Sequence, residues 1–536
     1  MKANNLLRIK GVRHTLLSFA SGVLLSLSYT VSSLWFLSFV ALVPLLVVLR
    51  NTEQKRVRFL WAFLAGTIYF GSVFSFLFSA HPITWSGIDN PALSVAFISG
   101  IWISTAVLFS LFTGIWGVLA RQMSKNTSSV ITLASLWVLF EWIQALSLSL
   151  LWWETQGLVG PHWTFGFIGY TLAGFPLLLS LASLGGVYLL SFVVVGINGL
   201  IFRTIVLQHT QKHSYRKLLL TCLFLALLSV TLYTINARAR DNAEVIQVAS
   251  LYTNFGPLFF TTPESESTKN LQIAGLFDTI LFEGKNPHLI LLPENSEYLA
   301  SLTAEKRKDL VRRMSKKEKV VIVDSYYSYD SEQNRKVAVL EYETGNNEIQ
   351  SYTKQLLVPT AEYLPRIILL LGNLFLEKDW NVYFENYLSI EKGGETTVGM
   401  HENLRIGALF CSEVLTPTLY KESTQRGANL LVNTASHSIL NSSEQIYNQI
   451  LKFSKVRAVE NNRFFVQSGN SVPSFAIDNH GRMLGETGRS KNSILYTDVL
   501  LLENKTVATR TGGLWIMMFA LLSIGGFIRR AVTGRI

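Results

Sequence analysis

The sequence predicts a bundle of membrane-spanning helices joined to an α/β domain. Of the 536 residues, 49% are hydrophobic and the mean hydropathy is +0.31, which is more apolar than a water-soluble protein of this size. Long apolar runs extend to about residue 236, a polar segment follows to about residue 510, and one more apolar run comes after it. We therefore expect three parts: a bundle of seven spans over residues 1–236, an extramembrane domain over 237–510, and an eighth span with a tail over 511–536.

The expected spans are each close to the roughly 20 residues needed to cross a bilayer. Two of them, the first pair, are short and share a brief polar turn. The eight segments are Thr15–Thr30, Ser33–Val48, Phe59–Phe78, Leu93–Leu119, Val130–Leu150, Gly185–Val206, Leu218–Ile235 and Leu514–Ile528.

Basic residues indicate the orientation of the spans. Lys and Arg occur at both termini and in alternate loops, whereas the loops around Thr30, 81–91 and 152–183 contain none. Because basic loops stay in the cytoplasm, both termini are expected there and the segment 237–510 on the outer side. That segment has 30 Lys and Arg against 32 Asp and Glu. The formal net charge of +11 therefore reflects topology, and a nucleic-acid partner is not expected.

The polar segment alternates strand-like and helix-like stretches, which predicts a layered α/β domain. Its catalytic or binding residues are expected where strands end in loops. Strands are expected at Val245–Leu251, Leu289–Leu292, Val320–Ser325, Val337–Tyr342, Leu404–Phe410, Leu430–Asn433, Phe464–Gln467 and Phe475–Asp478, and helices at Glu266–Phe282, Ala304–Ser315, Thr416–Gln425 and Glu444–Asn461.

Three residues in such loops form a candidate nucleophilic site: Glu294, Lys354 and Cys411. Taken one at a time, each has an ordinary structural explanation: a solvated carboxylate, a surface lysine and a small buried hydrophobic residue. Together, the lysine ammonium can keep the thiol partly ionised and stabilise an oxyanion, and the carboxylate can shuttle the thiol proton. The other cysteine, Cys222, lies in an expected span and cannot pair with Cys411. The chemistry indicated is acyl transfer through a thioester.

The order and context of these residues resemble the nitrilase, or carbon–nitrogen hydrolase, superfamily. Glu294 follows a strand and a proline, and Cys411 ends a strand with Glu413 two residues beyond it. Lys354 opens a Lys-x-x-Leu-Val-Pro-x-x-Glu-Tyr-x-Pro pattern that includes Glu362. The resemblance implies an αββα sandwich in which Glu294 is the proton acceptor, Lys354 the oxyanion stabiliser and Cys411 the nucleophile. Glu362 and Glu413 match supporting acids of the family.

Seven spans before such a domain and one after it resemble the apolipoprotein N-acyltransferases of the bacterial inner membrane, as do the stretches Phe39–Leu46 and Leu136–Trp142. This resemblance implies a multi-pass protein with a periplasmic catalytic domain. It also implies transfer of an acyl chain from a phospholipid, by way of a cysteine thioester, to the N-terminal amine of the diacylglyceryl-cysteine of a lipoprotein. The expected partners are these two substrates and the bilayer, with no cofactor and a monomeric state.

Some positions depart from the family pattern. Ser412 replaces an aromatic residue after the cysteine, and Asn433–Leu440 replaces an Asn-Asp-x-Trp-Phe-Gly-like loop. The loop 152–183, which contains no Lys or Arg, is expected at the membrane surface beneath the site, where it either admits an acyl chain or forms an ordinary aromatic belt. Its aromatic residues include Trp152, Trp153, Trp163, Phe165 and Phe167.

Two other functions remain open on sequence alone. A membrane-anchored amidase would use the same three residues, although one span would suffice to anchor it. A transporter or scaffold with a degenerate outer domain should show charged residues within its spans, and only Glu141 is a clear case. A metal site is not expected, because His401, His437 and His480 lack ligand spacing.

Overall fold

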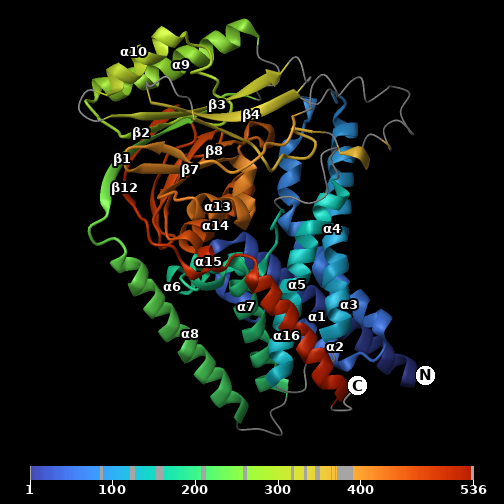
Figure 1. Cartoon of the computed structure of the whole chain (residues 1–536). Helices are drawn as coiled ribbons and strands as arrows, with labels where there is room; N and C mark the ends of the chain where they lie inside the picture. Colours follow the sequence, from blue (N-terminus) through green and yellow to red (C-terminus); the bar gives the residue numbers. More distant parts are fainter. Residues whose placement is uncertain are drawn as a thin grey trace.

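The structure is a computed structural model that describes residues 2–84, 88–120, 127–152, 162–206, 213–256, 262–315, 319–330, 335–344, 350–363, 365–367, 370 and 390–532. Its lower part is a bundle of helices and its upper part an α/β domain (Figure 1). The helices that precede the sheet are α1 (Lys2–Thr30), η1 (Ser32–Phe39), α2 (Val43–Asn51), α3 (Lys55–Val73), η2 (Ser75–Ala80), α4 (Pro91–Ala120), α5 (Thr127–Leu151), η5 (Ile168–Gly174), α6 (Pro176–Leu179), α7 (Ala182–Val206) and α8 (His213–Arg238).

Within the described residues, six segments are long and apolar enough to cross a membrane: Ser32–Asn51, Lys55–Ala80, Pro91–Ala120, Ser129–Ser149, Ala182–Ile205 and Tyr215–Arg238. The first expected span lies in α1, and the eighth is the shorter apolar helix Leu514–Arg529. The second expected span is not one α-helix. It is η1 followed by α2, because Pro44 has no backbone N–H to continue a helix and instead starts α2.

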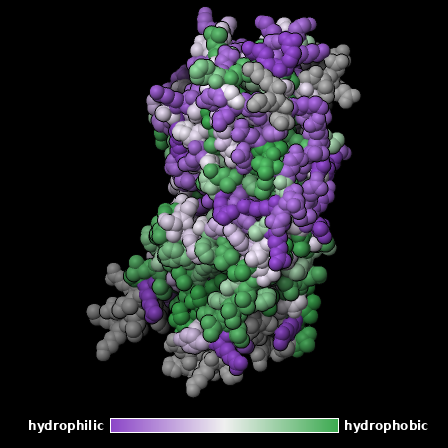
Figure 2. Space-filling model, turned by 90° about the vertical axis from the view of Figure 1, so that its left-hand side faces the viewer, coloured by the Kyte–Doolittle hydropathy of each residue, from purple (hydrophilic) through white to green (hydrophobic). Residues whose placement is uncertain are grey.

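The surface of the bundle is apolar, as expected for a membrane protein. Helix α8 packs little against its neighbours, and its large apolar side chains are exposed, with Leu219 at 69% and Phe224 at 62%. Figure 2 shows the hydrophobic residues gathered over the lower half of the molecule and the hydrophilic residues over the upper half. Exposed apolar area on this scale is stable only against lipid. The chain is therefore a membrane protein.

The α/β domain is built on a network of twelve described strands. Their order is β5-β4-β3-β2-β1-β9-β8-β7-β6, with β12 paired to β1 and β10 joining β9 to β11. The strands are β1 (Glu244–Thr253), β2 (Leu289–Leu291), β3 (Val321–Asp330), β4 (Arg335–Glu343), β5 (Gln350–Thr353), β6 (Gly399–His401), β7 (Leu404–Phe410), β8 (Leu430–Ser436), β9 (Phe464–Asn470), β10 (Phe475–Ile477), β11 (Met483–Glu486) and β12 (Ser493–Leu501). The helices with them are α9 (Pro263–Phe282), α10 (Ala304–Met314), η7 (Cys411–Leu415), α13 (Pro417–Gln425), η8 (Ser438–Leu440), α14 (Glu444–Asn461), α15 (Val507–Thr511) and α16 (Leu514–Val532).

Alternating side chains arrange these elements in layers. In β2, Ile290 faces a core made with α9 and α10, whereas Leu289 and Leu291 face the larger core shared with β7, β8 and α14. Successive side chains of a strand point to opposite faces, so β2 is buried on both sides. Helices α9 and α10 cover one side of the strands and α13 and α14 the other (Figure 1). The expected αββα order is confirmed.

The expected strand and helix positions agree closely with the structure, and β7 and α14 match at both ends. Four strands were missed: β5, β6, β11 and β12. Strand β12 was missed because most of its residues are only half-buried and carry no clean apolar alternation. It is held by antiparallel pairing along the whole of β1 instead.

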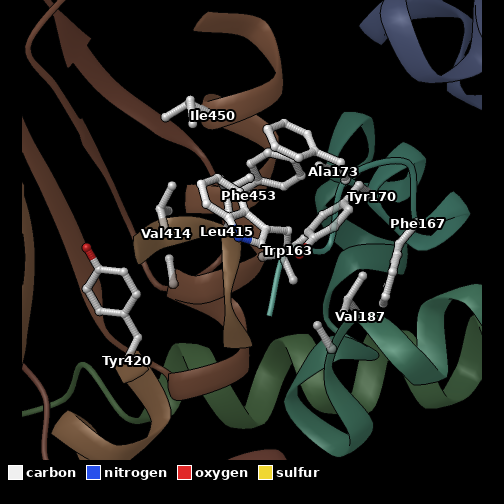
Figure 3. Packing of buried hydrophobic residues seen from close by; sticks show 14 of the residues in the cluster. Trp163, Phe167, Tyr170, Ala173, Val187, Val414, Leu415, Tyr420, Ile450 and Phe453 are labelled. Carbon is white, nitrogen blue, oxygen red and sulfur yellow. The ribbon is translucent and has the colours of Figure 1, made fainter. Parts of the chain in front are cut away.

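The α/β domain rests on the bundle through α14, which has two charged side chains that hydrogen-bond to groups of the bundle. Arg457 and Glu460 form an ion pair in which both side chains are buried, and Glu460 also accepts a hydrogen bond of 2.7 Å from the backbone N–H of Val187 in α7. The Arg457 guanidinium also donates to the hydroxyl of Tyr170 in η5. Figure 3 shows Tyr170 and Trp163 packed beside Phe453 and Leu415 of the upper domain. This buried pair fixes how the two parts meet.

We predict that Gly186→Ala destabilises this junction. Gly186 has φ +63° and ψ −160°, a conformation that is essentially restricted to glycine, and a Cβ there would lie 2.7 Å from Glu460 Oε1. The substitution should cost about 1–3 kcal/mol, measured as a lower unfolding temperature of the detergent-solubilised protein. Gly196→Ala, on the same helix with open space around its Cβ, is the control and should have little effect. Equal unfolding temperatures for the two variants would contradict this account.

Candidate active site

The three candidate residues come together at the ends of three strands. Glu294 follows β2, Lys354 directly follows β5, and Cys411 directly follows β7 as the first residue of η7. Lys354 Nζ lies 2.8 Å from Glu294 Oε1, and Cys411 Sγ lies 3.9 Å from the carbonyl oxygen of Ser436 at the end of β8. The Ser436 N–H donates to Glu294 Oε2 at 3.1 Å, so the same residue contacts both the base and the thiol.

Lys354 is a buried cation held between two carboxylates. Its side chain is 1% exposed, and its Nζ lies 2.5 Å from Glu362 Oε1 in addition to its bond with Glu294. The other oxygen of Glu362 accepts the N–H of Val358 at 2.8 Å, which closes the loop between them. Burial alone would lower the pKa of Lys354, but the two carboxylates raise it well above its usual value. Lys354 therefore remains an ammonium.

The surroundings of Cys411 favour its protonated thiol, whereas the sequence led us to expect that Lys354 keeps it partly ionised. Burial and then the charge of Glu294 raise the pKa of Cys411 far above its usual value, and Lys354 lowers it by less. One ammonium shared by two carboxylates cannot offset both burial and the second negative charge. Burial also raises the pKa of Glu294. A raised carboxyl pKa suits a group that takes up and returns a proton.

Glu413 supports the loops rather than the thiol. Its Oε1 accepts the Tyr352 hydroxyl and the Gln355 N–H, each at 2.6 Å, and its Oε2 accepts the Phe410 N–H at 2.7 Å. It thus ties the start of η7, which carries Cys411, to the loop that carries Lys354. Burial raises the pKa of Glu413 to about 7. Ser412, which differs from the family pattern, also links these loops, because its hydroxyl donates a hydrogen bond of 2.5 Å to the Leu356 carbonyl.

An apolar cavity of about 220 Å³ connects Cys411 to the membrane helices. Its walls come from η2, α4 and α5 of the bundle and from η7, η8 and α14 of the upper domain. Among the loop aromatics, Trp152, Trp163 and Phe165 line the cavity and are buried in protein, so they do not form an exposed belt. Phe167 does not line it and packs on Tyr188 instead, and Trp153 lies outside the described residues.

Two further residues lie at the candidate site but were not predicted as site residues from the sequence. Ser436 and His437 follow β8, the parallel neighbour of β7, so the rule that sites form at strand ends could have found both. His437 lines the cavity, and burial lowers its pKa to about 4. In the described part of the chain its Nδ1 has no hydrogen-bond partner. No three His, Cys, Asp or Glu side chains gather there in a way that could hold a metal ion.

The shared ammonium predicts an effect of Glu362→Gln on thiol reactivity. Glu362 helps to raise the pKa of Cys411, so removing its charge should lower that pKa and let Cys411 react with iodoacetamide at lower pH. The measurement is the pH profile of alkylation at Cys411, in a Cys222→Ser background. Glu395→Gln removes an exposed charge from the same domain and should leave the profile unchanged. A Glu362→Gln profile that is unshifted, or shifted to higher pH, would refute the role given to the shared cation.

Comparison with known proteins agrees with this site. Residues 21–200 match the model of the apolipoprotein N-acyltransferase N-terminal domain, and residues 276–504 match that of the carbon–nitrogen hydrolases. The chain is 25% identical to an apolipoprotein N-acyltransferase of Gloeobacter violaceus over 98% of this chain and 96% of that one. It is 24% identical to apolipoprotein N-acyltransferase 1 of Treponema denticola over 96% and 97%.

Among solved structures, Nit3 of Saccharomyces cerevisiae, a member of the nitrilase superfamily, aligns with 50% of this chain and 93% of its own. The sequence identity is 13% and the TM-score 0.35. The two domain matches together cover the bundle and the sheet, and the two relatives match nearly from end to end. The chain belongs to the apolipoprotein N-acyltransferase family, whose members join a membrane bundle to a carbon–nitrogen hydrolase domain.

Proposed function

We propose that the protein is an N-acyltransferase that moves an acyl chain from a phospholipid to the N-terminal amine of the diacylglyceryl-cysteine of bacterial lipoproteins. The observation that carries the proposal is the apolar cavity that runs from the membrane helices to Cys411. An amidase acting on small soluble amides would have no use for a cavity walled by α4 and α5. A transporter would have no use for a buried Glu–Lys–Cys cluster at its end.

The first half-reaction forms a thioester. Glu294 takes the proton of Cys411 as Sγ attacks the ester carbonyl carbon, and the Lys354 ammonium stabilises the oxyanion. When the carbon–oxygen bond of the ester breaks, Glu294 returns the proton to the leaving oxygen and a lysophospholipid departs. Because the thiol rests protonated, proton removal and attack occur together.

The second half-reaction forms the amide. The acceptor amine attacks the thioester carbon, Glu294 takes a proton from the nitrogen, and the carbon–sulfur bond breaks. Glu294 then protonates the Cys411 thiolate, which restores the resting enzyme. Such a ping-pong sequence lets two large amphiphiles use one site in turn. Glu362 and Glu413 act as positioning residues, the first on Lys354 and the second on the loops around it. The protein acts as a monomer without a cofactor.

The proposed topology places the catalytic domain, residues 237–510, in the periplasm, between a seven-span bundle of residues 1–236 and a last span within 511–536. It is supported by the basic loops and by the start of α1 and the end of α16, which lie together at the end of the bundle away from the sheets (Figure 1). The cavity then opens at the outer leaflet of the inner membrane.

The triad is tested by incubating the protein with phospholipid alone and measuring its intact mass. The wild type should gain one hydroxylamine-sensitive acyl group at Cys411, and Cys411→Ala should gain none. Glu294→Gln should slow adduct formation by roughly 10²–10⁴-fold and Lys354→Ala by roughly 10²–10³-fold. Glu395→Gln is the matched carboxylate control. An adduct on Cys411→Ala, or Glu294→Gln reacting at the wild-type rate, would refute the assignment.

The cavity predicts selectivity for chain length. Ala80 lies in its wall, so Ala80→Phe should shorten the space and slow adduct formation with dihexadecanoyl phospholipid more than with dioctanoyl phospholipid. The measurement is the ratio of the two initial rates. Ala92→Phe, at the exposed start of α4, adds the same ring outside the cavity and should leave the ratio unchanged. A ratio that Ala80→Phe does not alter would place the acyl chain elsewhere.

The topology predicts which positions a membrane-impermeant maleimide can reach in cells with a permeabilised outer membrane. In a Cys222→Ser background, Lys306→Cys on the exposed face of α10 should be labelled. Arg56→Cys, in an exposed position at the start of α3, should be labelled only after lysis. The reverse pattern would invert the orientation.

A further inference from the structure

A second cavity, of about 140 Å³, lies between the bundle and the α/β domain and shares no lining residue with the cavity at Cys411. It is formed where α7 and α16 begin, against α13, the end of α14, and α15. Trp142 and Trp515 form part of its wall, and the neighbouring Leu514 is 58% exposed. Tryptophan at the start of an apolar helix is typical of the level of lipid head groups.

The charge in this cavity is positive. Its charged lining residues are Lys421 and Glu460, and Glu460 is already neutralised by Arg457 and the N–H of Val187. In the described part of the chain, Lys421 Nζ makes no hydrogen bond or ion pair, and Glu422, the next residue, does not line the cavity and accepts a hydrogen bond from Thr396 at 3.0 Å. Burial lowers the pKa of Lys421, and the charges of Glu422 and Glu460 offset this only in part. A half-buried ammonium that lacks a direct hydrogen bond or ion pair is costly unless an anion joins it.

The remaining polar groups of the wall limit what the anion can be. Asn461 and Thr509 hydrogen-bond to each other at 3.1 Å, and His162 and Tyr188 do so at 2.9 Å, so these four groups are already partnered. Thr418, one turn before Lys421 on α13, shares a hydrogen bond of 2.8 Å with the Thr416 hydroxyl, and when it accepts that bond its own hydroxyl can donate beside the ammonium. An ammonium and a hydroxyl are common donors to a tetrahedral phosphate. We propose that this cavity binds the phosphate of a phospholipid head group at Lys421, as a lipid site separate from the one that feeds Cys411.

The proposal does not depend on the acyl-transfer reaction. The phosphate could belong to a lipid or be a free ion, and the position of Trp515 at the start of α16 favours the lipid. Di-O-tetradecyl phosphatidylglycerol is a suitable probe, because its ether-linked chains cannot acylate Cys411. Di-O-tetradecyl glycerol has the same chains without the phosphate, and inorganic phosphate has the anion without the chains.

The experiment measures binding of each probe to the full-length protein in detergent by native mass spectrometry. Lys421→Gln should weaken phosphatidylglycerol binding by about tenfold, the contribution of a charge-assisted contact, whereas Lys421→Arg should retain it. Lys306→Gln, an exposed lysine on α10, controls for net charge and should bind as the wild type does. Binding of the dialkylglycerol should not differ between the wild type and Lys421→Gln.

Several results would overturn the proposal. If Lys421→Gln binds phosphatidylglycerol with wild-type affinity, Lys421 does not bind the lipid phosphate. If Lys306→Gln loses as much affinity as Lys421→Gln, the loss comes from the change in net charge alone. If Lys421→Gln weakened dialkylglycerol binding as much as phosphatidylglycerol binding, Lys421 would not be recognising the phosphate. Displacement of the lipid by an equal concentration of inorganic phosphate would show that the site takes the free anion. Lys421→Arg keeps the positive charge. If it retains lipid binding, the loss of binding in Lys421→Gln comes from the lost charge, since a substitution at this position does not by itself unfold the site.

Discussion

The site depends on one ammonium shared between two buried carboxylates. Lys354 contacts Glu294 and Glu362 at 2.8 and 2.5 Å, and each side chain is buried. Burial raises the pKa of both the Cys411 thiol and Glu294, and the second carboxylate, which one cation cannot neutralise, adds to both shifts. In the proposed reaction, the raised pKa lets Glu294 carry the thiol proton, and the ammonium stabilises the oxyanion that develops when an ester is in place.

The membrane bundle supplies the second requirement, a dry path for an apolar chain. Helices α4 and α5 and the turn η2 form one wall of a cavity, and Cys411 lies in the other wall. Such a composite wall works only if the two parts of the protein keep a fixed relation. The buried Arg457–Glu460 pair, with its bonds to Tyr170 and to the Val187 N–H, provides this relation. Replacing either partner would leave a buried charge unpaired, which is more costly than losing a surface ion pair.

Much of this could be predicted from the sequence, and the limits have physical causes. Strand β7 and helix α14 were located at both ends because their apolar patterns are uninterrupted. Glu294 and Cys411 were found because each follows an apolar strand. Lys354 was found because it opens the Lys-x-x-Leu-Val-Pro pattern, since β5, the strand before it, was missed. The ionisation state of Cys411 could not be predicted from the sequence. It depends on burial and on how many carboxylates lie near Lys354, which are properties of the folded cluster. Ser436 and His437 were missed because their segment carries no family motif, and β12 because its burial comes from its pairing with β1.

In the proposed reaction the thioester passes to an amine rather than to water. Reconstituting the purified protein with an ester-linked phospholipid and a synthetic diacylglyceryl-cysteine peptide, followed by tandem mass spectrometry, distinguishes these two acceptors. We expect a peptide that carries one additional acyl group on its N-terminal amine, with one lysophospholipid formed for each. Release of free fatty acid and lysophospholipid beside an unmodified peptide would contradict it, and would identify the protein as a hydrolase.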